Sequence, residues 1–233
     1  MLKSLKDLKK KGIEMKSGDK APIMDFLTDD VDMTVRYIVV DAKGWLPGRK
    51  VLVSTETVGR PRENYEIPVN LTMDQIKNGP IVEKDKPIDR QFEQTLYGYY
   101  GWKPYWENEG QTQNLISMDE IMKYHLSASD GDIGHAEDLI IDDSDWTIRY
   151  MVVDMSNWNP AAKRTLISTN WIKDVNMKTK KIDVDVNKEM IKGAPEYDPE
   201  DMMITEAEKK LHAHYKKPTY WTKKAMEPQR ARI

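Results

Sequence analysis

The alternation of apolar and polar residues is clearest in residues 142–154, where a run of acids leads into a segment rich in β-branched and aromatic residues. Acidic turn formers before such a segment are typical of a hairpin that feeds a strand. The second face of this strand becomes apolar only at its end, at Met151 and Val153. We therefore predict a strand that enters a core half way along its length. Its first face carries larger side chains: Trp146, Ile148, Tyr150 and Val152.

The same pattern occurs 113 residues earlier, in residues 29–41, with nine of thirteen positions identical. Further matches extend the repeat: residues 52–55 match 166–169, and Tyr105-Trp106 match Tyr220-Trp221. A long period with only two copies indicates tandem domains and not a solenoid. We predict domains at 1–106 and 115–221, a polar linker at 107–114 and a basic tail at 222–233.

Each copy is expected to contain about six short strands and to close with helical material. Asp-Gly turns indicate tight hairpins, because such turns require positive φ. Ser4-x-x-Asp7 and Ser117-x-x-Glu120 predict helix starts, and Thr205-Glu206-Ala207-Glu208 predicts a helix that runs to Tyr215. The pattern favours a mainly β fold of two small barrels, each with short C-terminal helices.

The two copies are expected to lie against each other in one chain. A linker of eight residues spans at most about 28 Å. A domain of this size buries a modest core and can gain burial by association. We therefore predict an intramolecular pseudo-dimer with pseudo-twofold symmetry and with Trp and Tyr side chains at the seam.

Composition excludes several classes of function. The chain of 233 residues has 39% hydrophobic and 32% charged residues and a net charge of only -3, which does not favour nucleic-acid binding. The absence of cysteine excludes disulfides and thiolate metal sites. No apolar run approaches the roughly 18 residues of a membrane span, and no secretory signal is visible, so we expect a cytoplasmic protein without membrane insertion.

A composite motif resembles the PRC-barrel family. It is carried by residues 131–134, 137–143, 146–154 and 45–52, and the closing segments 191–198 and 220–221 resemble the longer bacterial branch of that family. The resemblance implies a six-stranded β-barrel. It also implies kinship with the cytoplasmic domain of the photosynthetic reaction-centre H subunit and the C-terminal domain of the ribosomal small-subunit maturation factor, neither of which performs chemistry itself. The chain lacks the membrane helix of the first and the separate N-terminal domain of the second, and fold does not fix function.

Residue patterns give little support to catalysis or metal binding. His212 and His214 lie two apart on a predicted helix, so they point to roughly opposite faces. The acid runs at 29–32 and 142–145 lack the further ligands of a calcium loop and are interpreted as turn chemistry. The ionisable cluster at 130–138, which includes His135, has no accompanying nucleophile motif. We expect no catalytic residue, metal or cofactor.

Aromatic residues and two arginines are the remaining candidates. Arg36 and Arg149 occupy matching places beside acids, and each is expected to form a structural ion pair within its own copy. Trp and Tyr are enriched in interfaces, although these rings could equally pack on their own barrel. The candidate interface residues are Trp102, Tyr105, Trp106, Tyr215, Tyr220 and Trp221.

The sequence favours a non-catalytic binding or scaffold protein that recognises a protein partner, like the H subunit but without a membrane anchor. Two alternatives stay open. An RNA- or ribosome-associated factor would show strong salt dependence of RNA binding. An enzyme or small-molecule binder would have a deep pocket on which several ionisable side chains converge.

Overall fold

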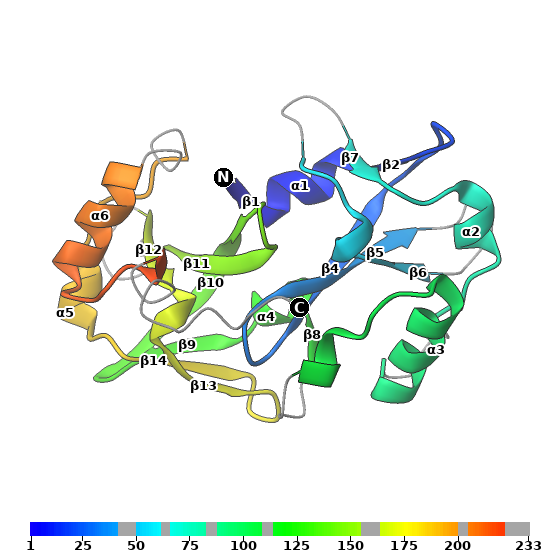
Figure 1. The fold of residues 1–233 in the computed structure, drawn as a ribbon. Coiled ribbons are helices and arrows are strands. Elements are labelled where there is room, and N and C mark those ends of the chain that lie inside the picture. Colours follow the sequence, from blue (N-terminus) through cyan, green and yellow to red (C-terminus); the bar gives the residue numbers. More distant parts are fainter. Residues whose placement is uncertain are drawn as a thin grey trace. The chain divides into compact units, whose positions relative to one another are not determined.

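The chain divides into two compact units, and each is described by itself. The computed structural model describes residues 1–41, 50–61, 66–82, 88–108, 114–154, 164–199 and 205–221 (Figure 1). The N-terminal unit consists of Lys3–Ile121 and Ile141–Ile148. The C-terminal unit consists of Met1–Leu2, Met122–Ile140 and Arg149–Ile233.

The N-terminal unit contains two small sheets. The first has the order β6-β5-β4-β8, and all of its strand pairs are antiparallel. The second has the order β3-β2-β7, in which β2 and β7 run parallel. The strands are β2 (Ile13–Met15), β3 (Lys20–Ala21), β4 (Ile23–Asp29), β5 (Val35–Asp41), β6 (Lys50–Ser54), β7 (Ile67–Val69) and β8 (Leu115–Ser117). The helices are α1 (Leu5–Lys11), α2 (Met73–Lys77), α3 (Arg90–Tyr100) and α4 (Met118–Ile121), with 3-10 turns η1 (Thr55–Thr57) and η2 (Tyr105–Asn108).

The strands that follow form one sheet with the order β12-β11-β10-β9-β14-β13, and β1 (Leu2–Ser4) pairs with β10. Only β9 and β14 run parallel among the pairs with a described register. The strands are β9 (His125–Ala128), β10 (Gly131–Asp142), β11 (Thr147–Asp154), β12 (Arg164–Ser168), β13 (Ile172–Asn176) and β14 (Lys181–Val184). The 3-10 turn η3 (Thr169–Trp171) and the helices α5 (Lys188–Lys192) and α6 (Thr205–His214) complete the unit.

The prediction of a mainly β fold with two closed barrels is wrong. The structure is mixed, with 28% helix and 41% strand, and its described strands form three open sheets. In the N-terminal unit, Pro22 separates β3 from β4, because proline has no amide hydrogen to continue a ladder. The matching position in the second copy is His135, and there β10 runs on without a break. In the sheet of the C-terminal unit, β12 and β13 end the strand order and follow each other in the chain through η3, but no described pairing between them closes the sheet.

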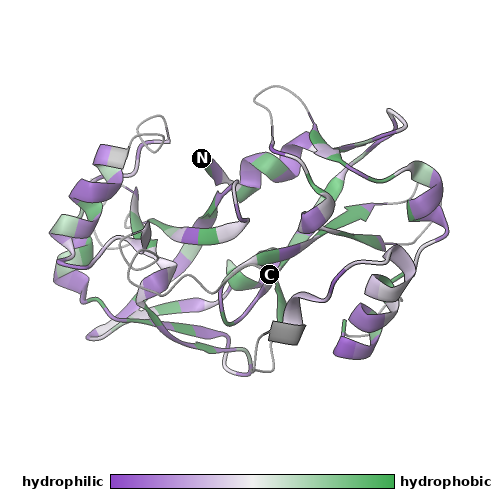
Figure 2. Ribbon diagram, in the orientation of Figure 1, coloured by the Kyte–Doolittle hydropathy of each residue, from purple (hydrophilic) through white to green (hydrophobic). Residues whose placement is uncertain are grey.

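Strand β11, which contains most of the alternating pattern of residues 142–154, is buried as that pattern predicts. In β11, Thr147 and Arg149 are half-exposed, whereas Met151 and Val153 on the same face are fully buried. In the first copy, β5 follows the same course, with Tyr37 and Ile38 fully buried. Figure 2 shows hydrophobic stretches along the strands, alternating with hydrophilic positions. The prediction of a strand that enters a core half way along is confirmed.

Capping residues fix the short helices where the sequence predicts them. The Ser4 hydroxyl accepts a hydrogen bond from the Asp7 amide at 3.1 Å, and the Ser117 hydroxyl accepts one from the Glu120 amide at 3.2 Å. Helix α1 ends at Gly12, whose φ of 80° lies in the left-handed region. A Cβ atom at Gly12 would lie 2.8 Å from the Ala21 carbonyl oxygen, so only glycine fits. None of the described helices combines the length and the apolar character that crossing a bilayer requires.

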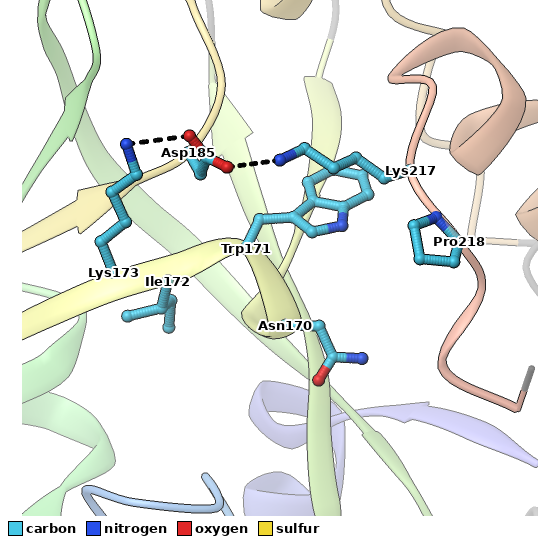
Figure 3. A pocket seen from close by; sticks show the side chains of 7 residues that line it. All are labelled: Asn170, Trp171, Ile172, Lys173, Asp185, Lys217 and Pro218. Atoms are coloured by element: carbon cyan, nitrogen blue, oxygen red, sulfur yellow. Dashed lines mark hydrogen bonds and ion pairs between the residues drawn. The ribbon is translucent and has the colours of Figure 1, made fainter. Parts of the chain in front are cut away.

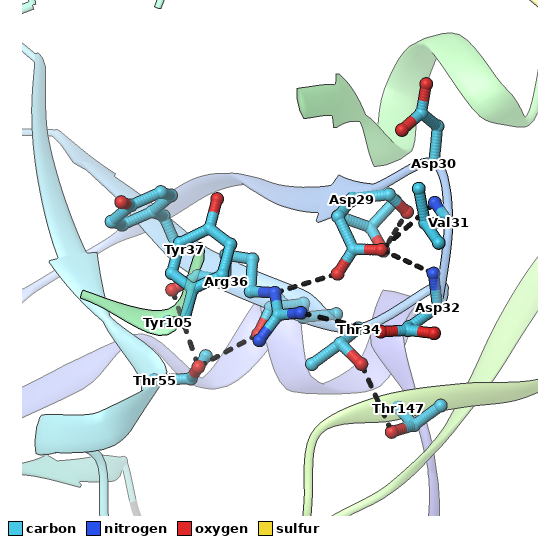
Figure 4. A network of polar contacts seen from close by, with 12 residues as sticks. Asp29, Asp30, Val31, Asp32, Thr34, Arg36, Tyr37, Thr55, Tyr105 and Thr147 are labelled. Atoms are coloured by element: carbon cyan, nitrogen blue, oxygen red, sulfur yellow. Dashed lines mark hydrogen bonds and ion pairs between the residues drawn. The ribbon is translucent and has the colours of Figure 1, made fainter. Parts of the chain in front are cut away.

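The acid run before β5 stabilises a turn through side-chain-to-backbone hydrogen bonds, as predicted. The buried Asp29 carboxylate accepts hydrogen bonds from the Val31 amide at 3.1 Å and the Asp32 amide at 2.6 Å (Figure 4). In the second copy, Asp142 accepts from the Ser144 amide and Asp145 from the Thr147 amide. Both runs therefore satisfy local backbone donors.

The tip of the β10–β11 hairpin belongs to the N-terminal unit, although its sequence belongs to the second copy. Thr34 and Thr147 form an antiparallel bridge there, and their hydroxyl oxygens lie 3.4 Å apart (Figure 4). The Val35 amide donates to the Trp146 carbonyl, and the Ile148 amide donates to the Met33 carbonyl, each at 2.8 Å. Met33 and Trp146, Thr34 and Thr147, and Val35 and Ile148 are equivalent positions, each pair 113 residues apart. Each of the two bonds is therefore the counterpart of the other in the repeat.

Candidate functional site

Helix α3, which closes the first copy, carries a buried glutamate that faces the sheet. Glu93 on α3 is only 3% exposed, and one carboxylate oxygen accepts hydrogen bonds from Tyr37 at 2.8 Å and Tyr105 at 2.7 Å. Its other oxygen lies 2.9 Å from Nη1 of Arg90. Burial raises the pKa of both tyrosines, and the carboxylate raises them further because it disfavours a phenolate beside it. The network fastens α3 to β5 and η2.

The C-terminal unit has a matching buried network. Glu208 on α6 is 7% exposed, and its carboxylate accepts a hydrogen bond from Tyr150 of β11 at 2.7 Å. The Tyr150 hydroxyl also lies 3.0 Å from Nε2 of His212, and Nδ1 of His212 lies 2.9 Å from the Pro218 carbonyl oxygen. Burial raises the pKa of Tyr150, while burial lowers the pKa of His212 because it disfavours the imidazolium.

The two networks are equivalent, at an offset of 113 residues for the strand tyrosines and 115 for the helix residues, with two substitutions that change their chemistry. Glu93 corresponds to Glu208, but Arg90 corresponds to Thr205 and Tyr97 to His212. From the sequence, Glu208 is expected only as a member of a capping box, and Glu93 is not among the candidate residues. The repeat contains a signal for this contact. The closing helix of each copy has a glutamate at the matching position, and the buried strand of each copy has a tyrosine at the matching position.

The predicted interface rings of the first copy pack against their own unit. Trp102, Tyr105 and Trp106 surround the buried Tyr97, with ring centroids 5.4, 6.0 and 4.7 Å from it. All three are partly buried against the cluster built on Leu27, Tyr37, Val39, Leu52, Leu96 and Tyr97. They cover the β4–β5–β6 face and are themselves half-buried.

The predicted interface rings of the second copy are placed in the same way. Tyr215 is fully buried and packs against Trp171, with ring centroids 4.5 Å apart, so it contributes nothing to an exposed surface. Tyr220 and Trp221 are half-buried and stack edge to face at 4.8 Å. Trp221 also lies 6.2 Å from the His212 ring.

The two arginines face these aromatic clusters. Nε of Arg36 lies 2.7 Å from the buried Asp29 carboxylate, an ion pair inside the first copy, and its guanidinium lies 4.1 Å from the centroid of the Tyr105 ring (Figure 4). The Arg149 guanidinium lies 4.3 Å from the centroid of the matching Tyr220 ring.

A depression of about 210 Å³ opens on the C-terminal unit between β13, the end of β14 and the segment after α6. Lys173 and Lys217 both bind the Asp185 carboxylate, at 2.9 and 2.6 Å (Figure 3). The hydrogen bonds from these two ammonium groups, Lys173 first, lower the pKa of Asp185 to about 2. Trp171, Pro218, Asn170 and Ile172 line the rest of the depression.

A second depression of about 270 Å³ lies on the N-terminal unit beside α1. It is lined by several lysines, but most have acidic partners within the unit. Lys9 binds Asp119 at 2.8 Å, Lys10 binds Asp7 at 2.8 Å, and Lys20 binds Glu66 at 2.6 Å. The local positive charge is therefore largely compensated. The other lining residues are Lys11, Gly12, Ala21 and Pro22.

The histidines are distributed over separate contacts. His125 and His135 are paired across β9 and β10, with ring centroids 4.4 Å apart, and Nδ1 of His135 lies 3.1 Å from the Tyr124 carbonyl oxygen. His214 contacts the Met190 carbonyl oxygen at 2.7 Å, whereas His212 belongs to the buried network. Within the described ranges, no group of three or more His, Asp or Glu side chains is placed to hold a metal ion.

Comparison with known proteins gives no family assignment. The chain matches no protein-family profile and shows no significant similarity to a curated protein.

Proposed function

We propose that this chain is a non-catalytic binding protein that recognises an acidic segment of a protein partner at the depression of the C-terminal unit. The observation that carries the proposal is the sharing of one carboxylate, Asp185, by two ammonium groups, Lys173 and Lys217. This trio has a net positive charge. An acidic side chain of a partner fits there better than a basic one.

The surroundings of the trio support a protein ligand. Trp171 and Pro218 provide an apolar wall next to the charges, and aromatic residues are enriched at interfaces. Strand β13 pairs with β14 on one side only, and no other described strand covers its outer edge. An extended segment with an acidic residue could therefore contact the edge and the depression together.

The alternatives of an RNA-associated factor and of an enzyme or small-molecule binder have weaker support. The lysines beside α1 are mostly neutralised by acids of the same unit, so they form no strongly basic stripe. The tyrosines with the most strongly raised pKa values lie inside the two buried networks, bonded to Glu93 and Glu208 and not in the depression. The resemblance to the PRC-barrel family is a further hypothesis, on which the proposal does not depend.

Photo-crosslinking tests this function directly. A photoreactive residue at the exposed Asn170, on the rim of the depression, should capture a protein in cells, and the adduct should disappear when Lys173 and Lys217 are both replaced by Glu. The same residue at Lys210, an exposed position on α6, serves as the control. A ribonuclease-sensitive adduct would favour the RNA alternative. An adduct that survives the charge reversal, or none at all, would contradict the proposal.

A further inference from the structure

In the buried network of the C-terminal unit, two acceptors meet at the single hydroxyl hydrogen of Tyr150. The Pro218 carbonyl can only accept, so Nδ1 of His212 carries the hydrogen of that 2.9 Å contact. Nε2 of a neutral His212 would then be an acceptor, and an ionised Glu208 is an acceptor as well. The Tyr150 hydroxyl touches both, at 3.0 and 2.7 Å, but has one hydrogen to donate.

An additional proton satisfies all of these contacts. If it lies on Nε2 of His212, the imidazolium donates to Tyr150 and Tyr150 donates to Glu208. If it lies on Glu208, the carboxylic acid donates to Tyr150 and Tyr150 donates to His212. Without it, two lone pairs face each other across one of the short contacts inside a core where water cannot intervene.

The matched network of the N-terminal unit needs no such proton. An ionised Glu93 accepts the hydroxyl hydrogens of Tyr37 and Tyr105, and Arg90 supplies a positive charge at 2.9 Å. Tyr97, which stands where His212 stands, is a phenol and brings its own hydrogen. Two exchanges therefore separate these sites, Arg90 for Thr205 and Tyr97 for His212, and the second changes the number of hydrogens available to the network.

We infer that Tyr150, Glu208 and His212 form a triad that shares one additional proton, beyond those of an ionised glutamate and a neutral histidine. This shared proton fastens α6 to β11. Other polar groups face the triad as well. Arg149 of β11 and Tyr220 lie together on one side, Trp171 of η3 lies 5.2 Å from the His212 ring, and Tyr215 packs behind Trp171. Lys217 is turned toward Asp185 (Figure 3).

Burial decides where the proton spends most of its time. Desolvation lowers the pKa of His212, and the hydrogen bonds of the ring to the backbone at Pro218 and Lys217 offset this only in part. A neutral imidazole is therefore favoured, and the shared proton lies between Glu208 and Tyr150. The triad as a whole is the titrating unit, because its members are directly bonded to one another.

The sign of the pH dependence follows from this count. In the unfolded chain, glutamate and histidine have ordinary pKa values of about 4.3 and 6.5, so above pH ~6.5 they hold no additional proton. The folded chain then binds one proton more than the unfolded chain, and its stability falls as the pH rises. A buried neutral histidine alone, with a lowered pKa, would do the opposite and gain stability as the pH rises through about 6.5. Above pH ~6.5 the shared proton makes the stability fall, whereas the lone histidine gives only a small remaining rise that levels off.

Urea unfolding of the full chain between about pH 6.5 and 8.5 distinguishes them, with amide NMR signals of α6 and β11 as local probes. We expect the unfolding constant of the wild type to rise by up to roughly tenfold per pH unit, the limit for one proton. Glu208→Gln should remove most of this slope, because the amide supplies a permanent hydrogen to Tyr150. His212→Gln should remove it as well, because it takes away the group that creates the excess acceptor.

Glu93→Gln is the matched control, because it changes the equivalent glutamate of the other unit and should leave the slope at α6 and β11 unchanged. An unfolding constant that falls or stays flat over this pH range in the wild type would overturn the inference. A wild-type slope retained in both His212→Gln and Glu208→Gln would overturn it too. If one variant fails to fold, the other variant and the sign of the wild-type slope still decide.

Discussion

At the scale of single residues, the stability of this protein depends on a few buried carboxylates whose partners lie within the same unit. Asp29 is the clearest case, because it is fully buried and accepts from two amides and from Arg36. Two of these donors share one carboxylate oxygen and Arg36 uses the other, so a change at either oxygen leaves a buried donor unsatisfied. By contrast, Lys173 is exposed and Lys217 is half-buried, and their pairing with the exposed Asp185 contributes little to folding.

We expect Asp29→Asn to destabilise the chain by about 2–3 kcal/mol, because it removes the charge that holds Arg36 and replaces an acceptor by a donor on one side. The matched control is Asp32→Asn, since Asp32 is exposed and lies 3.9 Å from Arg36. The control should cost less than about 0.5 kcal/mol. Urea unfolding followed by circular dichroism measures both. Equal costs for the two variants would show that Asp29 has no special structural role.

At the scale of elements, short strands and helices are placed by local devices that the sequence reveals. Ser4 and Ser117 cap α1 and α4 at the positions expected from the pattern. The acid runs make the turns before β5 and β11. These contacts span two or three residues, so the local sequence contains both partners. The resulting elements are short, and tertiary packing supplies most of their stability.

Two glycines test how closely α1 approaches β3. Gly12 and Gly18 have nearly equal φ values, 80° and 83°, but only Gly12 has backbone atoms within reach of an added Cβ. We expect Gly18→Ala to cost about 1 kcal/mol, from the left-handed conformation alone. Gly12→Ala should cost about 1–3 kcal/mol more, because the added methyl group overlaps the Ala21 carbonyl oxygen. Thermal or urea unfolding of both variants measures the difference, and similar losses would contradict the close approach.

At the scale of the whole molecule, the compact units do not follow the repeat residue by residue. Residues 115–121 and 141–148 come from the second copy, yet they belong to the N-terminal unit. Strand β8 pairs with β4 through Leu27 and Ser117, and the bridge between Thr34 and Thr147 adds the hairpin tip. Trp146 is buried there, with its ring 6.4 Å from the Phe26 ring. These contacts all lie inside the N-terminal unit, and the intramolecular pseudo-dimer stays a prediction.

We expect Trp146→Ala to destabilise β4 and β5 by about 3 kcal/mol, because the loss of a buried tryptophan leaves a cavity. Hydrogen exchange at the amides of Phe26 and Ile38 measures the effect, and the exposed Ser144→Ala is a control at the same hairpin tip. A fragment of residues 1–121 should likewise protect β4 better than a fragment of 1–106, because only the longer one contains β8. Unchanged protection of β4 in the variant would contradict the composition of the N-terminal unit.

The sequence by itself determined the repeat, the strand that enters a core half way along, the helix caps and the acidic turns. Each of these depends on residues a few positions apart or on the exposure of alternate side chains. Tertiary structure decided the rest. Three open sheets replace the expected barrels: Pro22 cannot donate to a ladder, and no described pairing joins β12 and β13, the two edge strands of the C-terminal sheet. The depression at Asp185 and the buried glutamates, Glu93 and Glu208, depend on residues 32 to 58 positions apart in the chain. No local pattern encodes such contacts, because their free energy exists only once the core has closed around them.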